Sequence, residues 1–169
     1  MRTLFTPWRY EYLTSPKARQ ECIFCLASES DDDESTLILY RNDQILVMLN
    51  RYPYSNGHLM VAPIEHGSDL HSTDDSTLFA LIRLTAEAQR ILSDTYKADG
   101  FNIGMNVGEA GGAGFAFHYH MHVVPRWNGD SNFMTVTAET RLVPEDLLAT
   151  WAKLRQRFSE LKEDFSRTP

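Results

Sequence analysis

The chain has 169 residues, which is about the length of one typical domain. Hydrophobic residues make up 43% and charged residues 23%, a balance that excludes disordered, collagen-like and coiled-coil proteins. Because 16 Lys and Arg residues face 23 Asp and Glu residues, the formal net charge is −7, and the chain has no overall electrostatic attraction for nucleic acid or anionic lipid.

The sequence pattern of the first half of the chain predicts an N-terminal arm, a loop and three strands. The aromatic and basic segment 1–20 either packs on the domain or contributes to a base-stacking pocket. The acidic run 28–35 is expected to be a solvent-exposed loop. Short runs rich in Leu, Ile and Val predict strands at 37–40, 44–49 and 58–63.

An amphipathic helix is predicted over residues 74–98, where apolar residues recur every three or four positions. These positions are Leu78, Leu81, Ile82, Thr85, Ala88, Leu92 and Tyr96. Ser72 or Thr73 is expected to cap the start of this helix, and Gly100 lies just past its end.

The second half predicts two more strands and a last helix. Strands are expected at 101–107 and 118–124, separated by the glycine-rich loop 108–114, with Pro125 ending the second strand. Apolar residues repeat again in a helix that Pro144 begins, and this helix is expected to pack on the sheet or on a partner subunit.

The order of elements predicts an α+β protein with a mainly antiparallel sheet of about five strands, one central helix and a C-terminal helix. We expect a single domain. It consists of an N-terminal arm (1–21), a core (22–135) and the C-terminal helix (144–165).

The two cysteines, Cys22 and Cys25, are too few for a secreted disulfide scaffold and are typical of a reducing compartment. The segment 1–13 lacks the apolar stretch of a signal peptide, and no window approaches the ~18 apolar residues of a membrane span. We therefore expect a cytoplasmic protein that binds neither membrane nor nucleic acid.

Three histidines occupy alternate positions, at His118, His120 and His122. On a strand these side chains share one face, about 6.6 to 6.8 Å apart in succession, while the residues between them face the core. Aligned imidazoles can bind a metal, sense pH, or act as nucleophile and acid-base catalyst. Because the outer two lie about 13 Å apart, one metal ion cannot easily bind both, and at most one of the three is expected to be a ligand.

The glycine-rich loop 108–114 precedes these histidines. Such loops most often serve only as turns. Glycines also let backbone N–H groups approach an anion, so the loop beside a nucleophile would form a phosphate cradle. An acidic chain needs such local donors for an anionic ligand.

The motif His118-x-His120-x-His122-Val123-Val124 resembles that of the histidine triad (HIT) superfamily of nucleotide hydrolases and transferases. Nearly the whole chain contributes to the resemblance, through residues 6–12 (TPWRYEY), 22–25 (CIFC), 49–61 (LNRYPYSNGHLMV) and 125–133 (PRWNGDSNF). These segments are similar to the bacterial branch that contains diadenosine tetraphosphate phosphorylases and related HIT hydrolases. The resemblance implies a HIT-like fold, a homodimer and no organic cofactor.

The resemblance also implies roles for single residues. His120 would attack the α-phosphorus of a nucleotide, and water or phosphate would release the nucleotide from the histidine. His122 would contact the phosphate and the bridging oxygen and assist the leaving group. Asn50 would lie near the ribose, or alternatively only cap a turn. His58 either supports the triad or is an ordinary buried histidine of a strand.

In the phosphate-binding loop, Asn106 and the backbone of Gly114 and Phe115 match the family pattern. Gly114 and Phe115 lack the side-chain donors that many members have there, and Phe117 stands where this branch usually has an acidic residue. These departures leave the leaving-group preference open. Arg51 and Arg126 could add positive charge near a polyanion.

The Cys22-x-x-Cys25 pair has three interpretations: ordinary thiols, a redox pair that lacks the usual βαβ context, or half of a zinc site. Relatives with this motif complete the site with a histidine after the third strand and with the first triad histidine. Here those residues are His66 and His118, with His71 as a rival to His66. Structural zinc is the favoured interpretation, because four such ligands form a complete tetrahedral shell.

We therefore expect an enzyme that cleaves a dinucleoside polyphosphate, such as diadenosine tetraphosphate, through a nucleotidyl-histidine. Transfer to phosphate would give ADP and ATP, and transfer to water would give AMP and ATP. The alternatives are hydrolysis of a nucleoside phosphoramidate, nucleotidyl transfer to another acceptor, or a nucleotide-binding protein that has lost turnover.

Overall fold

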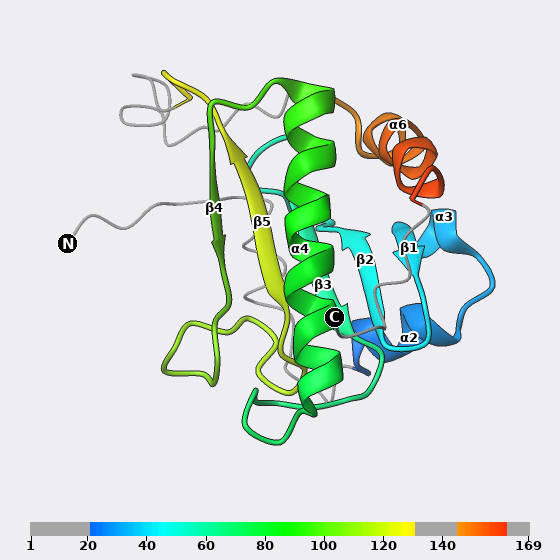
Figure 1. Ribbon diagram of the computed structural model, residues 1–169, viewed down its shortest axis with the longest axis vertical. Coiled ribbons are helices and arrows are strands. Elements are labelled where there is room, and N and C mark those ends of the chain that lie inside the picture. Colours follow the sequence, from blue (N-terminus) through cyan, green and yellow to red (C-terminus); the bar gives the residue numbers. More distant parts are fainter. Residues whose placement is uncertain (1–20, 131–144, 162–169) are drawn as a thin grey trace.

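The computed structural model describes residues 21–130 and 145–161. At its centre lies a five-stranded sheet in the order β1-β2-β3-β5-β4, in which each pair of neighbours is antiparallel. The strands are β1 (Ile38–Arg41), β2 (Ile45–Leu49), β3 (Leu59–Pro63), β4 (Gly100–Gly104) and β5 (Met121–Arg126). The predicted α+β class and antiparallel sheet are confirmed (Figure 1).

Helices pack on the sheet and beside its edge strand β1. The long helix α4 (Asp75–Tyr96) crosses one face, and α6 (Leu147–Ser159) packs beside β1 (Figure 1). Two short helices, α2 (Ile23–Glu29) and α3 (Asp33–Thr36), precede β1. In the part of the chain that the structure describes, no helix is long and apolar enough to cross a bilayer.

The alternation of side chains along the strands divides the buried residues between two cores. On β2, Val47 and Leu49 belong to the core beneath α4, whereas Leu46 and Met48 belong to a second core that also contains Phe24 of α2. All five residues of β2 are buried, because both faces of this strand are covered. The sheet thus has an α4 face and an α2 face.

The predicted cap of the central helix was wrong. Asp74 is the N-cap, and its carboxylate accepts a hydrogen bond from the Thr77 amide at 3.0 Å. Both predicted caps have other partners, since Ser72 donates to Asp69 and the Thr73 hydroxyl contacts the Tyr119 hydroxyl at 2.8 Å.

The end of this helix also differs from the prediction. Lys97 forms the C-cap in the left-handed conformation, with φ of 51°, and Gly100 instead begins β4. Ile82 lies on the outer side of the helix and is 57% exposed, while Leu84 and Ile91 are buried in the core.

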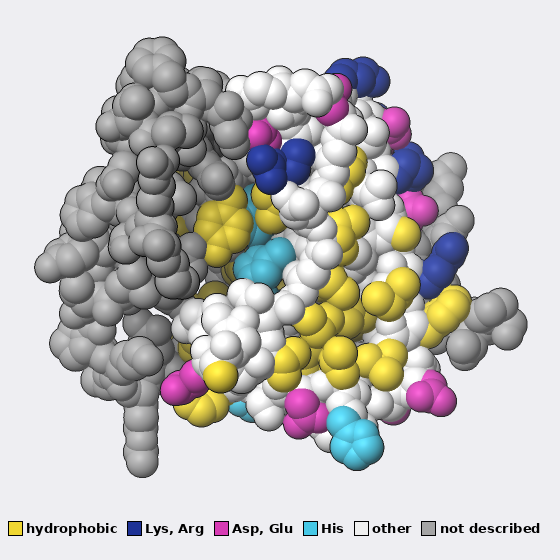
Figure 2. Space-filling model, turned by 90° about the vertical axis from the view of Figure 1, so that its left-hand side faces the viewer, with side chains coloured by type: hydrophobic (Ala, Val, Ile, Leu, Met, Phe, Trp, Pro, Cys, Tyr) yellow, Lys and Arg dark blue, Asp and Glu magenta, His cyan; other side chains and the backbone are white. Residues whose placement is uncertain are grey.

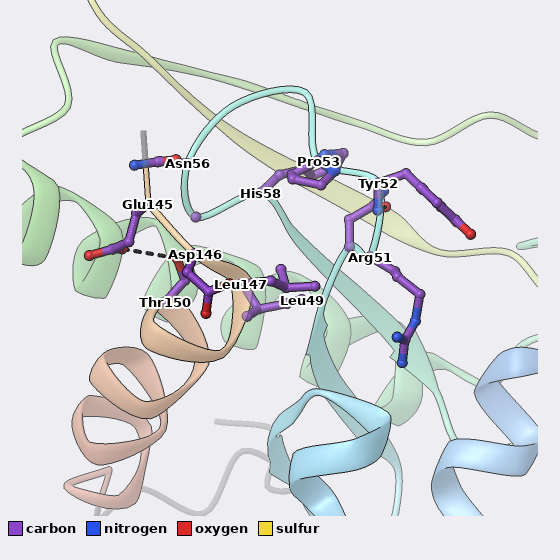
Figure 3. A pocket seen from close by; sticks show the side chains of 12 residues that line it. Leu49, Arg51, Tyr52, Pro53, Asn56, His58, Glu145, Asp146, Leu147 and Thr150 are labelled. Atoms are coloured by element: carbon purple, nitrogen blue, oxygen red, sulfur yellow. Dashed lines mark hydrogen bonds between the residues drawn. The ribbon is translucent and has the colours of Figure 1, made fainter. Parts of the chain in front are cut away.

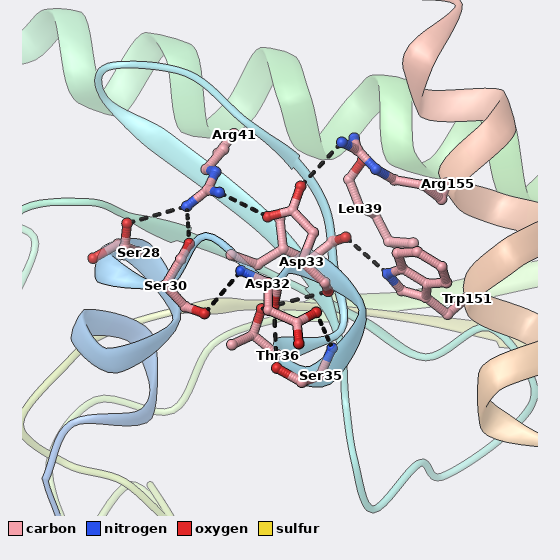
Figure 4. Close-up of polar contacts among 11 residues, drawn as sticks. Ser28, Ser30, Asp32, Asp33, Ser35, Thr36, Leu39, Arg41, Trp151 and Arg155 are labelled. Atoms are coloured by element: carbon pink, nitrogen blue, oxygen red, sulfur yellow. Dashed lines mark hydrogen bonds and ion pairs between the residues drawn. The ribbon is translucent and has the colours of Figure 1, made fainter.

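The acidic run 28–35 is not the continuous loop that was predicted. It contains the end of α2 and most of α3, which Asp32 caps by accepting a hydrogen bond from the Ser35 amide at 3.1 Å. Asp33 pairs with Arg41 at 2.9 Å and with Arg155 of α6 at 3.0 Å (Figure 4). Local capping and these two cations order a segment whose composition alone favours solvent.

Helix α6 satisfies the backbone of the edge strand β1. The Trp151 indole donates to the Ile38 carbonyl at 2.8 Å, and the Arg155 guanidinium donates to the Leu39 carbonyl at 2.7 Å. Asp146 caps the helix, so it begins after the predicted start, while residues 144 and 162–165 of the prediction lie outside the described residues.

The last strand begins three residues later than predicted, at Met121, so His118 and His120 precede it. The Tyr119 amide donates to the Gly67 carbonyl at 2.8 Å instead of to a neighbouring strand. Pro125 continues β5 opposite Phe101. The register of β3 with β5 stops at Val123, so no β3 residue pairs with Pro125, which has no N–H to donate.

The alternation predicted for this segment is correct even though only part of it is a strand. The core beneath α4 contains Tyr119, Met121 and Val123, as expected. On the preceding strand, β4 ends at Gly104 and not at Val107.

The burial of single residues of α6 predicts how much each contributes to the free energy of unfolding. Leu154 is fully buried in the core, and Leu154→Ala should lower the free energy of unfolding by about 2 to 5 kcal/mol because it removes packed methyl groups and leaves a cavity. Leu148 lies on the same helix and is 51% exposed, so Leu148→Ala should change it by less than about 0.5 kcal/mol. Urea denaturation of both variants measures this, and equal losses would contradict the packing of α6.

Candidate active site and metal centre

Two triad histidines lie in a pocket on the α2 face of the sheet. The pocket has a volume of about 570 Å³, and we call it the triad pocket. Six residues predicted from the sequence line it: Asn50, Asn106, Gly114, Phe115, His120 and His122. They come from separate parts of the chain. Apolar walls are added by Ile23, Leu26, Ala27, Leu37, Met48 and Met60.

The backbone determines which nitrogen of His120 carries a proton. Nδ1 of His120 lies 2.9 Å from the His118 carbonyl oxygen, and a carbonyl can only accept. Nδ1 is therefore the N–H donor, and Nε2 of the neutral ring keeps its lone pair. The ring is buried against Phe24, with centroids 4.8 Å apart, and burial lowers the pKa of His120. A neutral imidazole with an available Nε2 is a competent nucleophile.

His58 and His122 form a directed hydrogen bond. The Tyr54 amide donates to Nδ1 of His58 at 3.1 Å, so the proton of the neutral His58 ring is on Nε2. His58 Nε2 lies 2.9 Å from Nδ1 of His122, which must then accept. The proton of a neutral His122 is therefore on Nε2. This tautomer can donate a hydrogen bond to a departing oxygen.

His58, one of the predicted substrate-binding residues, does not line the triad pocket. It is fully buried and touches His122 from behind. The ring of Tyr54 stacks on it with centroids 4.8 Å apart. His58 is thus a buried histidine that also orients a triad ring, so the two interpretations left open by the sequence coexist.

Asparagines and glycines shape the polar side of the triad pocket. The Asn50 side-chain oxygen accepts from the Tyr52 amide at 2.9 Å, so this residue caps a turn as well as lining the pocket. The Asn106 amide donates to the Gly112 carbonyl at 3.2 Å and connects the strand end to the glycine-rich loop. Gly108 and Gly112 have φ of 72° and 85°, values that favour glycine.

The aromatic residues of the loop differ in burial. Phe115 packs edge-on against Phe24, with ring centroids 6.4 Å apart. Phe117 is 66% exposed. The two arginines differ too. Arg51 is exposed at the edge of the triad pocket, whereas Arg126 is hydrogen-bonded to Asp130 and lies in a neighbouring hollow.

A further hollow of about 410 Å³ lies behind His58, between the loop of residues 51–57 and the start of α6 (Figure 3). Glu145 and Asp146 contribute two carboxylates to it. Glu145 accepts hydrogen bonds from Tyr96 at 2.6 Å and from Thr150 at 2.9 Å. A polyanion would meet negative charge there, so this hollow is the less suitable nucleotide site.

Four predicted metal ligands meet at the end of the α2 face. The ligand atoms of Cys22, Cys25, His66 and His118 all lie within 4.8 Å of one another. Cys22 Sγ is 3.2 Å from Nδ1 of His118, and Cys25 Sγ is 3.3 Å from Nδ1 of His66. His71, the alternative to His66, does not belong to this group.

The chemistry of this cluster suits a cation. His118 Nε2 lies 2.9 Å from the Pro63 carbonyl and must donate to it, so Nδ1 presents its lone pair to the cysteines. Burial lowers the pKa of His118 to about 4, so its ring is neutral. Burial and a hydrogen bond with Cys22 raise the pKa of the Cys25 thiol to about 11. A metal ion would reverse that shift, because it binds the thiolate. These four residues can hold a metal ion.

Comparison with known proteins identifies the family of this chain. Residues 32–129, more than half of the chain, match the HIT domain model. The chain belongs to the HIT family. An AP-4-A phosphorylase of Mycobacterium tuberculosis is 34% identical over 167 residues, which cover 90% of this chain and 86% of the relative. The resemblance noted in the sequence is confirmed, and with it the prediction of a HIT enzyme that processes nucleotides.

Solved HIT structures have the same fold. A Zn-bound histidine triad family protein of Mycobacterium smegmatis superimposes with a TM-score of 0.65 at 27% identity, over 83% of this chain and 94% of its own. A protein of Sulfolobus tokodaii described as a hypothetical histidine triad nucleotide-binding protein gives the same four values.

The sequence missed two groups of pocket residues in this HIT protein. The sequence pattern indicates no role for Tyr54, although its amide donates to His58 and its ring stacks on that histidine. Ile23 and Leu26 on α2 form an apolar wall. Their signal was the apolar residues around the two cysteines, but a seven-residue helix is too short for periodicity to show it.

The tautomers inferred above can be measured directly. Long-range ¹H–¹⁵N spectra of the imidazoles at neutral pH should show His120 with its proton on Nδ1 and His58 with its proton on Nε2, because backbone groups impose both assignments. The exposed His71 should show a mixture and serves as the reference. A His58 ring protonated on Nδ1 would contradict the directed hydrogen bond to His122.

Proposed function

We propose that the protein cleaves dinucleoside polyphosphates, such as diadenosine tetraphosphate, at an α-phosphate through a nucleotidyl-His120 intermediate. The observation that carries this proposal is the placement of the unprotonated Nε2 of His120 in the same pocket as His122, Asn106 and the glycine-rich loop. The relative named AP-4-A phosphorylase supports the substrate class.

The triad pocket offers a separate surface to each part of a nucleotide. Apolar side chains from α2, β2 and β3 suit a base, and Asn50, which lines the same pocket, would contact the ribose. Asn106 and the backbone of Gly114 suit the phosphate. The chain has a net charge of −7, so the protein as a whole does not attract a polyanion. The phosphates would therefore be bound by these neutral hydrogen-bond donors and by Arg51.

In the first step, the lone pair on Nε2 of His120 forms a bond to the α-phosphorus. The bond from that phosphorus to the oxygen bridging the α- and β-phosphates breaks, and the oxygen keeps the electron pair. His122 stabilises the charge that develops on this oxygen by donating a hydrogen bond from its Nε2–H, and it keeps the proton. For diadenosine tetraphosphate the products are adenylyl-His120 and ATP.

In the second step, an oxygen of water or of phosphate attacks the same phosphorus, and the bond to Nε2 breaks. His120 regains its lone pair. A phosphate oxygen attacks as an anion, an attacking water loses its proton to solvent, and His122 keeps its Nε2 proton throughout. Water yields AMP and phosphate yields ADP. His58 keeps the ring of His122 in the required tautomer through both steps.

Replacement of the nucleophile tests this mechanism. His120→Asn should lower kcat for diadenosine tetraphosphate by at least about 10³-fold, because no nitrogen lone pair remains to form the intermediate. Affinity for AMP should change only a few-fold. Chromatography of products with and without phosphate measures turnover and identifies ADP or AMP.

The matched control is His71→Asn, which changes an exposed histidine outside the triad pocket and should keep full activity. Unchanged turnover in His120→Asn would exclude this nucleophile. A wild-type protein that binds AMP and cleaves no phosphoanhydride would instead be a nucleotide-binding module.

We also propose that the four-residue cluster binds a structural zinc ion. Two cysteines and two histidines are a donor set typical of tetrahedral structural zinc, and a HIT protein of known structure is Zn-bound. The ion would connect α2, the segment after β3 and the residues before β5. It supplies rigidity there, and His120 and His122 remain the reacting pair.

Metal analysis tests the zinc proposal. The purified protein should contain one zinc per chain, and both Cys22→Ser and His66→Ala should lose most of it, because three ligands bind zinc more weakly than four. His71→Ala is the control and should retain the metal, since His71 is not part of the cluster. A metal-free wild-type protein would refute the site.

A further inference from the structure

A second hollow adjoins the triad pocket. It has a volume of about 980 Å³ and lies over β4 and β5 on the α2 face of the sheet. Three residues line both cavities: Tyr54, Asn106 and His122. The view onto the β4 edge shows histidine side chains within a hollow beside this strand, with basic side chains near one end (Figure 2). The two cavities therefore meet at His122.

The geometry of phosphoryl transfer determines the direction in which the leaving group departs. The attacking and leaving atoms lie roughly in line on opposite sides of the phosphorus. His120 lines only the triad pocket, and His122 lies at the junction. The two rings are in edge-to-face contact, with centroids 4.7 Å apart. A phosphate attacked by His120 therefore lies in front of both rings and directs its leaving group away from His120, toward the side of His122. That direction leads into the second hollow.

Beside His122, a glycine occupies the paired position on β4, so this position places no side chain over the backbone of the second hollow. Gly104 pairs with His122 across β4 and β5, and a Cβ built on Gly104 would meet no atom within 4 Å. Its φ is not positive, so the backbone does not require glycine there. Gly104 is the last residue of β4, and because it has no side chain the backbone beside His122 is open to a ligand.

The side chains of the second hollow suit a nucleoside better than free phosphate. Trp127 and Tyr54 provide aromatic surface, and the Trp127 indole is held by a hydrogen bond to the Tyr96 carbonyl at 3.3 Å. Arg126 binds Asp130 through two hydrogen bonds, of which the Nη2 contact is 2.8 Å, so its charge is already compensated. Aromatic rings can stack on any nucleobase, whatever its identity.

The relative sizes of the two cavities agree with unequal products. Cleavage at one α-phosphate of diadenosine tetraphosphate keeps a nucleoside monophosphate on His120 and releases a nucleoside triphosphate. The triad pocket measures about 570 Å³ and the second hollow about 980 Å³. The second hollow is thus large enough for the larger product.

From these observations we infer that the hollow over β4 and β5 binds the second nucleoside of a dinucleoside polyphosphate, the one that departs with the leaving group. This inference rests on the proposed function for the identity of the substrate. It assigns the second hollow a specificity role, because a substrate without a second nucleoside would leave its aromatic surface unused.

A binding experiment tests the inference without turnover. In a His120→Asn background, the dissociation constants of diadenosine tetraphosphate and adenosine 5′-tetraphosphate are measured by calorimetry, and their ratio isolates the second nucleoside. We expect the dinucleotide to bind about tenfold more tightly, as stacking of one base allows. Adding Gly104→Leu should obstruct the part of the second hollow beside His122 and reduce the ratio to within about twofold of one.

Gly100→Leu is the matched control. Gly100 lies on the same strand, four residues away, with equal open space around its Cβ, but does not line the hollow. It should preserve the ratio. Trp127→Ala removes aromatic surface by a different route and should lower the ratio as Gly104→Leu does.

The result has distinct outcomes. A ratio near one before either substitution overturns the inference, as does a ratio that survives both Gly104→Leu and Trp127→Ala. If Gly104→Leu weakens both ligands equally, the leucine disturbs the triad pocket, and Trp127→Ala then decides. A protein that shows the expected ratio but does not cleave the dinucleotide would refute the proposed function and leave this binding site in place.

Discussion

The hydrogen bond from His120 Nδ1 to the backbone carbonyl of His118 is the interaction on which the candidate site depends. It leaves the lone pair on Nε2, the atom that would attack a phosphate in the proposed mechanism. The side chain of His118 is bound separately, by the Pro63 carbonyl on one nitrogen and by the cysteine cluster on the other. One residue therefore orients the proposed nucleophile with its backbone and belongs to the Cys/His cluster with its side chain. Disorder at the cluster would be transmitted to His120 through a single peptide group.

The sheet supports this arrangement by keeping the chemical face and the packing face apart. Tyr119 and Met121 are buried beneath α4, so His120 and His122 between and beyond them must face the other side. The Tyr119 amide and hydroxyl are both bonded, to Gly67 and Thr73, which holds the residues before β5 in an extended course without strand partners. A shift of one residue would bury the triad and expose the core residues, so the packing of the core fixes the register of the site.

The features that depend on short periodicities could be predicted from the sequence, and those that depend on distant partners could not. Alternation placed the three histidines on one face, and helical spacing located α4 within one or two residues at each end. Nothing local distinguished Asp74 from Thr73 as a cap, because the choice depends on a hydroxyl 46 residues away. The order in the acidic run depends on Arg155, also far along the chain. The homodimer and the roles of the single site residues remain predictions.

The net charge of −7 constrains how a HIT protein of this composition can bind a polyanion. Carboxylates near the cavities are matched locally, Asp130 by Arg126 and Glu145 by Lys153. The hollow behind His58 still gathers two carboxylates, whereas the triad pocket presents amides, glycine backbone and neutral imidazoles. Neutral donors attract a highly charged product less strongly than a cluster of lysines would. A site built this way depends on shape and on aromatic contact for its selectivity, which is why an extended substrate with a nucleoside at each end suits two adjoining cavities.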